Sequence, residues 1–298
     1  MWSETHARTE AERVATGLTL EDLIAMQPRF VRGTLAPGQR IPGGERVGRG
    51  RAQSLEFDGL SPYEPGDDVR WIDWRATARS GKPQVRRFVA ESHRGRMIVA
   101  DLKADLRFGT QNRLMGKTVA LVAAYLAWES LILHEPVGLC LQGSPAKAPR
   151  RGRRHMLTLL DALKAGYDAP NAGHDLGAAI SDGSSCMRLG DELIVISDFA
   201  EPLDQIVEIG RAQSEMRRLR AIVVEDPLAR QPLAAGAYPA RDATTGARKV
   251  FRLGSRAASA SATIGNEART RRVSRLRDGG WQVMDAHDLL PRDAGARR

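Results

Sequence analysis

A chain of 298 residues can hold one large domain or two modest ones, and a hydrophobic fraction of 42% is enough to bury a sizeable core. The formal net charge of +9 indicates a surface that attracts anions, which admits an acidic protein, nucleic acid or an anionic membrane as partner. The two cysteines exclude a disulfide scaffold and match no metal-binding spacing. The polar N-terminus lacks the apolar core of a signal peptide, and the most apolar stretch, Val119 to Leu133, is shorter than a membrane span. We therefore expect a cytoplasmic protein with no membrane span.

The first part of the chain predicts one short helix followed by a β-rich segment. Thr19 precedes two acidic residues and matches a helix N-cap with negative charge in the first turn. We assign residues 1–30 to an N-terminal helical segment. The β-rich segment spans residues 31–95, with a glycine- and proline-rich loop at 33–50 and strands at 54–57 and 83–91.

From residue 96 onward, strands and helices alternate. The alternation and the continuous apolar runs predict an α/β domain over residues 96–290, with a mostly parallel sheet covered by helices on both faces, and a tail at 291–298. We predict strands at 97–102, 136–143, 191–199, 220–227, 249–254 (an edge strand) and 281–286, and helices at 117–134, 155–165, 175–181, 201–218 and 268–277.

Two motifs suggest chemistry but have simpler explanations. Gly109 to Thr118 resembles a phosphate-binding loop, but six residues separate its first glycine from the Gly-Lys-Thr triplet where that loop has four. We interpret the triplet as the start of a helix. Asp67, Asp68 and Asp73 could hold a metal, but arginines lie among them, which favours a salt-bridged structural cluster.

The segment from Tyr63 to Glu91 resembles the signature of the domain-of-unknown-function 58 family, and the resemblance extends from about residue 46 to about residue 288. It implies a von Willebrand factor A-like, or Rossmann-like, sheet preceded by a β-rich segment. The matching residues, which we expect to be structural, are Tyr63, Gly66, Asp67, Asp68, Arg70, Asp73, Trp74, Arg79 and Glu91.

The resemblance also implies an adhesion-type metal site at the carboxyl edge of the sheet. Such a site holds Mg²⁺ with an Asp-x-Ser-x-Ser loop, a threonine and a further aspartate. Here Asp101 and Asp198 keep the two aspartates, whereas Lys103 and Asp105 replace the serines and His174 replaces the threonine. Our hypothesis is that the Lys103 ammonium lies among the three aspartates in place of the metal, so that no cofactor is expected. In the alternative, Lys103 turns outward, and Mg²⁺ or another divalent cation binds Asp101, Asp105, His174 and Asp198.

For function, the resemblance implies a bacterial, non-enzymatic protein that co-operates with a MoxR-type AAA+ ATPase in the assembly or maturation of client proteins. The degenerate site of Asp101, Lys103, Asp105, His174 and Asp198 would then bind the partner. One alternative is nucleic-acid binding by the basic surface, which is disfavoured because acidic residues interleave with the arginines and no ladder of aromatics accompanies them. The other is a metal-dependent hydrolase, for which no base or nucleophile can be named.

Overall fold

The fold is seen in a computed structural model, and the chain divides into two compact units. One unit is Phe30–His93, and the other combines Met1–Arg29 with Arg94–Arg298. The predicted loop at 33–50, the tail at 291–298 and the residues Gly66, Asp67, Asp68, Glu91 and His174 lie outside the described residues. The structure describes residues 17–27, 55–63, 69–90, 95–109, 113–170, 175–200, 202–226, 229, 234–241 and 247–290.

The small unit contains an antiparallel strand pair and a short helix. Strands β1 (Leu55–Pro62) and β2 (Gln84–Ala90) pair with each other, near the strands predicted at 54–57 and 83–91. Between them lie a 3₁₀ turn, η1 (Val69–Trp71), and helix α3 (Trp74–Ser80), which the sequence analysis did not predict.

Asp73 and Gly81 set the two ends of α3. The Asp73 carboxylate accepts hydrogen bonds from the backbone N–H groups of Arg75 and Ala76 at 3.1 and 3.0 Å, so this aspartate is a helix N-cap. Gly81 ends the helix with φ of 68°, a conformation that favours glycine. The interpretation of Asp73 as part of a salt-bridged cluster did not include this capping role.

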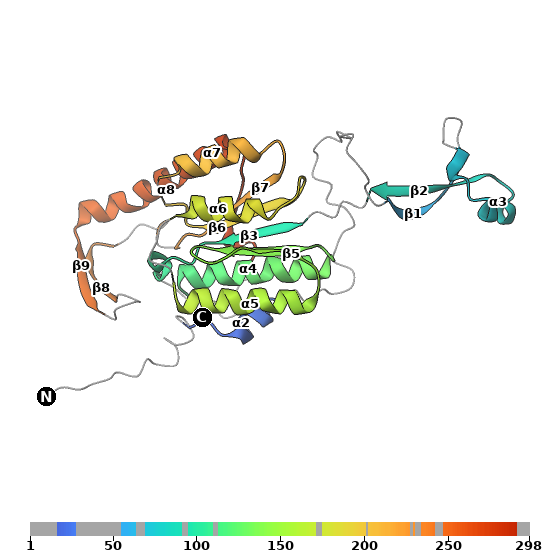
Figure 1. The fold of residues 1–298 in the computed structure, drawn as a ribbon. Helices are drawn as coiled ribbons and strands as arrows, with labels where there is room; N and C mark the ends of the chain where they lie inside the picture. The colour runs from blue at the N-terminus through green and yellow to red at the C-terminus, as the bar shows by residue number, and fades with distance from the viewer. Residues whose placement is uncertain are drawn as a thin grey trace. The chain divides into compact units, whose positions relative to one another are not determined.

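The large unit is built on a six-stranded sheet with the order β10-β7-β6-β3-β4-β5 (Figure 1). All neighbours pair in parallel except β4 and β5, which are antiparallel. Numbered along the chain, this is the order 3-2-1-4-5-6 of doubly wound sheets, so the predicted α/β fold class is confirmed. The strands are β3 (Arg96–Ala100), β4 (Val137–Leu141), β5 (Lys147–Arg150), β6 (Glu192–Ser197), β7 (Arg218–Val223) and β10 (Gln282–Asp285).

Helices cover both faces of this sheet (Figure 1). Side chains alternate along β3: Ile98 and Ala100 enter one core cluster, and Met97 and Val99 enter the other. The first cluster contains residues of α4 (Met115–Ile132), α5 (Arg153–Asp168) and α2 (Leu20–Ala25). The second contains residues of α6 (Leu176–Ser185), α7 (Asp204–Gln213) and α8 (Ser255–Asp278).

Helix α4 is apolar around most of its circumference. By length and composition alone it could cross a membrane, but 72% of that segment is buried inside the protein, as in the core helix of a globular unit. The Gly-Lys-Thr triplet lies in its first turns, where it was expected to start a helix. The Lys117 ammonium lies 3.3 Å from the Asp22 carboxylate of α2.

The N-terminal helix α2 packs onto α4 and belongs to the large unit. Thr19 and Asp22 form a capping box, in which each side chain accepts a hydrogen bond from the backbone of the other residue at 3.1 Å. Leu23 is fully buried, and its carbonyl accepts a hydrogen bond from Trp128 Nε1 at 3.0 Å. The N-cap predicted at Thr19 is therefore confirmed, and helix α2 packs on the core.

Three predicted elements differ from the structure. The helix predicted to reach residue 218 ends at Gln213, because the following residues turn into β7. The helix predicted from residue 268 begins at Ser255, because the alanine-rich run before it continues the helix. The strand predicted at 249–254 exists as β9 (Arg248–Leu253), but it does not lie at the edge of the six-stranded sheet: it pairs with β8 (Gly236–Arg241) in a separate two-stranded sheet.

Candidate functional site

The candidate site lies where β3 and β6 end side by side. In the parallel register Ala100 is opposite Ile196, and Asp101 N donates a hydrogen bond to the Ile196 carbonyl at 3.0 Å. Asp101 follows β3 directly, and Asp198 follows the last residue of β6. The structure thus brings these two predicted site residues together at the carboxyl edge of the sheet.

The Asp101 carboxylate is fully buried and accepts hydrogen bonds on both oxygens. Oδ2 accepts from Ser197 Oγ at 2.7 Å, and Oδ1 accepts from Gln142 Nε2 at 3.2 Å and from Lys103 N at 3.3 Å. Burial raises the pKa of Asp101 above its ordinary value, while the nearby Lys103 ammonium and the Ser197 hydroxyl oppose that rise. The ionised form of Asp101 therefore depends on the groups around it.

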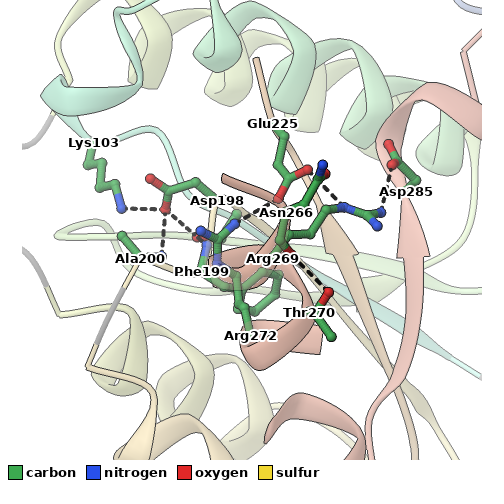
Figure 2. Close-up of polar contacts among 11 residues, drawn as sticks. Lys103, Asp198, Phe199, Ala200, Glu225, Asn266, Arg269, Thr270, Arg272 and Asp285 are labelled. Atoms are coloured by element: carbon green, nitrogen blue, oxygen red, sulfur yellow. Dashed lines mark hydrogen bonds and ion pairs between the residues drawn. The ribbon is translucent and has the colours of Figure 1, made fainter. Parts of the chain in front are cut away.

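The Lys103 side chain turns inward and contacts both aspartates. Its Nζ atom lies 2.6 Å from Asp198 Oδ1 (Figure 2). The same atom lies 3.4 Å from Asp101 Oδ2. Burial alone lowers the pKa of Lys103, but the Coulomb attraction of Asp101 and Asp198 more than offsets that effect, so its pKa is raised. The ammonium thus stays charged at neutral pH.

A strained turn holds Asp198 in place. Phe199 is fully buried and has φ of 48°, a left-handed conformation that costs a bulky residue on the order of 1–3 kcal/mol. Its N–H donates to Ser197 Oγ at 3.0 Å, and the N–H of Ala200 donates to Asp198 Oδ1 at 3.1 Å (Figure 2). The turn therefore keeps the Asp198 carboxylate aimed at Lys103.

The residues present do not fit the Mg²⁺ ion that an adhesion-type site holds. Mg²⁺ needs near-octahedral oxygen coordination at about 2.0–2.1 Å. Here an ammonium lies between Asp101 and Asp198, and both Asp101 oxygens already accept hydrogen bonds. Within the described part of the chain, which leaves out His174, no group of three or more His, Cys, Asp or Glu is placed to hold a metal.

A cavity of about 420 Å³ opens beside Lys103. Asp105, an exposed residue in the 3₁₀ turn η2 (Ala104–Leu106), lines it together with Asp101 and Lys103. The first turns of α6 and α7 contribute the opposite wall through residues that include Gly177 and Gln205. The cavity therefore combines charged side chains with open space beside them.

A second ion-paired cluster, which the sequence analysis missed, lies at the same edge of the sheet (Figure 2). Glu225 follows β7, and its carboxylate accepts from Arg269 Nε at 2.9 Å and from Arg272 Nη1 at 3.0 Å. Arg269 Nη2 also donates to Asp285 at the end of β10, at 3.1 Å. These two arginines of α8 reach the acidic edge, as the acidic ends of β7 and β10 could have indicated.

The described signature residues all lie in the small unit. Tyr63 N donates to the Pro83 carbonyl at 2.9 Å, and Asp73 caps α3. Trp74 is 69% exposed, so this tryptophan is not a core residue of the unit. Arg70 lies in η1 and Arg79 in the last turn of α3.

Strand order and the position of the aspartates define an α/β protein of the von Willebrand factor A-like class, with Lys103 in contact with both aspartates. The family described as "Protein of unknown function DUF58" matches residues 60–272, and the chain belongs to this family.

Relatives and solved structures give further points of comparison. The uncharacterized proteins Mb1516 of Mycobacterium bovis and Rv1480 of Mycobacterium tuberculosis are 30% identical over 195 residues, which is 64% of this chain and 61% of each relative. The match thus spans less than two thirds of these relatives. An aerotolerance-related membrane protein of Bacteroides fragilis is similar with 14% identity and a TM-score of 0.36, covering 62% of this chain and 98% of that one. For BatB of Bacteroides thetaiotaomicron the identity is 13%, with the same TM-score and coverage.

Proposed function

We propose that the protein is a non-enzymatic, cytoplasmic partner-binding module that works with a MoxR-type AAA+ ATPase on client proteins. The binding surface in this proposal is the cavity beside Asp101, Lys103 and Asp198. The observation that carries the proposal is the position of Lys103 Nζ, 2.6 Å from Asp198 and 3.4 Å from Asp101. A chain that supplies its own cation keeps the acidic edge assembled without a divalent metal.

The charge of the site indicates the chemistry of the partner. An adhesion site with Mg²⁺ accepts a carboxylate in the metal's open coordination position. Here the Lys103 ammonium contacts the carboxylates of Asp101 and Asp198 and has no coordination position to offer, and the Asp105 side chain lines the same cavity. In this proposal the partner supplies a lysine or arginine, whose positive charge suits the acidic side chains at this edge of the sheet.

The groups at the site support binding rather than catalysis. Asp101 is engaged with three donors, and the Lys103 ammonium, held charged by its neighbours, cannot act as a base at neutral pH. Burial raises the pKa of the Cys140 thiol to about 11, so this cysteine is an inert core residue and not a nucleophile.

Metal analysis tests the lysine replacement. The purified full chain is treated with EDTA and dialysed, then its metal content and melting temperature are measured with and without MgCl₂ or MnCl₂. We expect no stoichiometric metal and an unchanged melting temperature. In the matched variant Lys103→Ser, which restores the serine of the adhesion motif, added Mg²⁺ or Mn²⁺ should raise the melting temperature. Stoichiometric metal in the unsubstituted protein would contradict the proposal.

A pull-down tests the partnership itself. The full chain is immobilised and exposed to a lysate of its source organism with a non-hydrolysable ATP analogue, and mass spectrometry identifies the bound AAA+ ATPase. Recovery should persist in Leu157→Ser, a control on the exposed side of α5, and should fail in Asp105→Lys, which reverses a charge in the cavity. If no MoxR-type ATPase is recovered, or Asp105→Lys recovers as much as the control, the proposed function is wrong.

A further inference from the structure

The β8–β9 hairpin presents apolar side chains to solvent. It lies at the N-terminal end of α8, beside the helix-covered sheet and not within it (Figure 1). The first five side chains of β9 are exposed, including Val250 at 64% and Phe251 at 59%. A two-stranded sheet is marginally stable by itself, and exposed apolar groups on such a sheet indicate an interaction surface.

The outer edge of β9 is open to a third strand. Among the strands that the structure describes, β9 pairs only with β8, so no described strand occupies its other edge. The partner strand β8 contains Pro239, which lacks an N–H group to donate, whereas β9 contains no proline. No proline therefore removes a donor from the backbone groups that β9 directs away from β8.

Basic residues flank the apolar ones on both faces of β9. Because side chains alternate along a strand, Arg248, Val250 and Arg252 share one face, and Lys249 and Phe251 share the other. Each face thus has an apolar group with a positive charge beside it. None of these residues lines the cavity near Lys103.

We infer that β9 binds an extended segment of another protein in which acidic and apolar residues occur together, and that this segment pairs with the open edge of β9 as an added strand. The backbone hydrogen bonds supply affinity. Specificity comes from carboxylates facing Arg248, Lys249 and Arg252, and from apolar side chains facing Val250 and Phe251. This surface is independent of the proposed function at the cavity.

Fluorescence anisotropy with synthetic peptides tests the inference on the full chain. The probe is a short labelled peptide with the repeat Glu-Glu-Val-Val, which places a glutamate and a valine on each face of the added strand. Its companions are a peptide with lysine in place of glutamate, and the glutamate peptide with alternate backbone nitrogens methylated. We expect only the unmethylated glutamate peptide to bind, and the double variant Lys249→Glu, Arg252→Glu to weaken that binding at least about tenfold.

A charge exchange separates lost recognition from a lost hairpin. The double variant should gain affinity for the lysine peptide, which an unfolded hairpin could not do. Phe251→Thr, which keeps a strand-forming residue, should weaken binding of the glutamate peptide, while Arg153→Glu on α5 should leave it unchanged. Equal binding of the methylated peptide would overturn strand addition. The inference is also wrong if the glutamate peptide does not bind, or if only phosphatidylglycerol vesicles do.

Discussion

The carboxyl edge of the sheet holds two clusters in which acidic side chains at strand ends are neutralised by cationic side chains from different places in the chain. At the ends of β3 and β6, Asp101 and Asp198 meet Lys103, which lies two residues after Asp101 in the chain. At the ends of β7 and β10, Glu225 and Asp285 meet Arg269, which lies 44 residues after Glu225 in the chain. One cation comes from the adjoining loop and the other from a distant helix.

The two clusters also differ in burial. The Lys103 side chain is 10% exposed, whereas those of Arg269 and Arg272 are 34% and 21% exposed. A buried charge that loses its partner is more costly than a half-exposed one, because water cannot replace the lost interaction. We therefore expect the lysine cluster to be the more sensitive of the two.

The largest effect is expected for Lys103→Met. Removing the ammonium leaves the buried Asp101 and its neighbour Asp198 without their cation, which should lower the free energy of unfolding of the large unit by about 3–5 kcal/mol at neutral pH. Urea denaturation measures it. The control Lys164→Met, at a more exposed lysine on α5, should change it by no more than about 0.5 kcal/mol. If Lys103→Met lost as little stability as Lys164→Met, the lysine cluster would not be the more sensitive of the two clusters.

A smaller effect is expected for Glu225→Gln. The substitution weakens two charge-assisted hydrogen bonds, but Arg269 keeps Asp285 and both arginines reach water, so the loss should be about 1–3 kcal/mol. The same denaturation experiment measures it, with Glu267→Gln on the exposed side of α8 as control. A loss equal to that of Lys103→Met would show that burial does not set the difference.

The free energy of unfolding lost in Lys103→Met should also change with pH, by less than the loss itself at neutral pH. The raised pKa of Lys103 means that its contribution is fully present below the ordinary lysine pKa and is lost as pH rises through the folded value. The raised pKa of Asp101 means that its charged form costs stability, and this cost disappears as pH falls through that value. The deficit should thus be largest near neutral pH and shrink toward both acid and alkali. Urea denaturation at several pH values measures this loss. A loss that does not change with pH would contradict an ion pair between Lys103 and the two aspartates.

The smallest effect is expected at the surface pair of Arg275 and Asp204. The Asp204 side chain is 78% exposed, so Asp204→Asn should change the free energy of unfolding by at most about 0.5 kcal/mol. Added salt should abolish even that difference, whereas it should leave most of the Lys103→Met deficit in place. A loss above about 1 kcal/mol would show that the exposure of an ion pair does not predict its contribution to the free energy of unfolding.

The sequence predicts the lysine cluster better than the arginine cluster for a physical reason. Asp101 and Asp198 follow neighbouring parallel strands, and Lys103 lies two residues after Asp101 in the same loop. The strand pattern and this short separation are enough to predict that the three residues lie close together. The contacts of Gln142 and Arg269 depend on which strands and helices are neighbours in the fold. Tertiary packing decides this, and the sequence pattern does not show it. Strands β5 and β8 escaped prediction because they are short and lack alternating apolar residues.

Helix α2 and strand β3 both belong to the large unit, yet the small unit lies between them in the chain. In the chain, residues 30–93 are therefore an insertion that is connected to the large unit at both of its ends. A molecule that contacts both units would meet the second at a raised effective concentration, because one chain joins them, so two weak contacts could act together as one strong attachment.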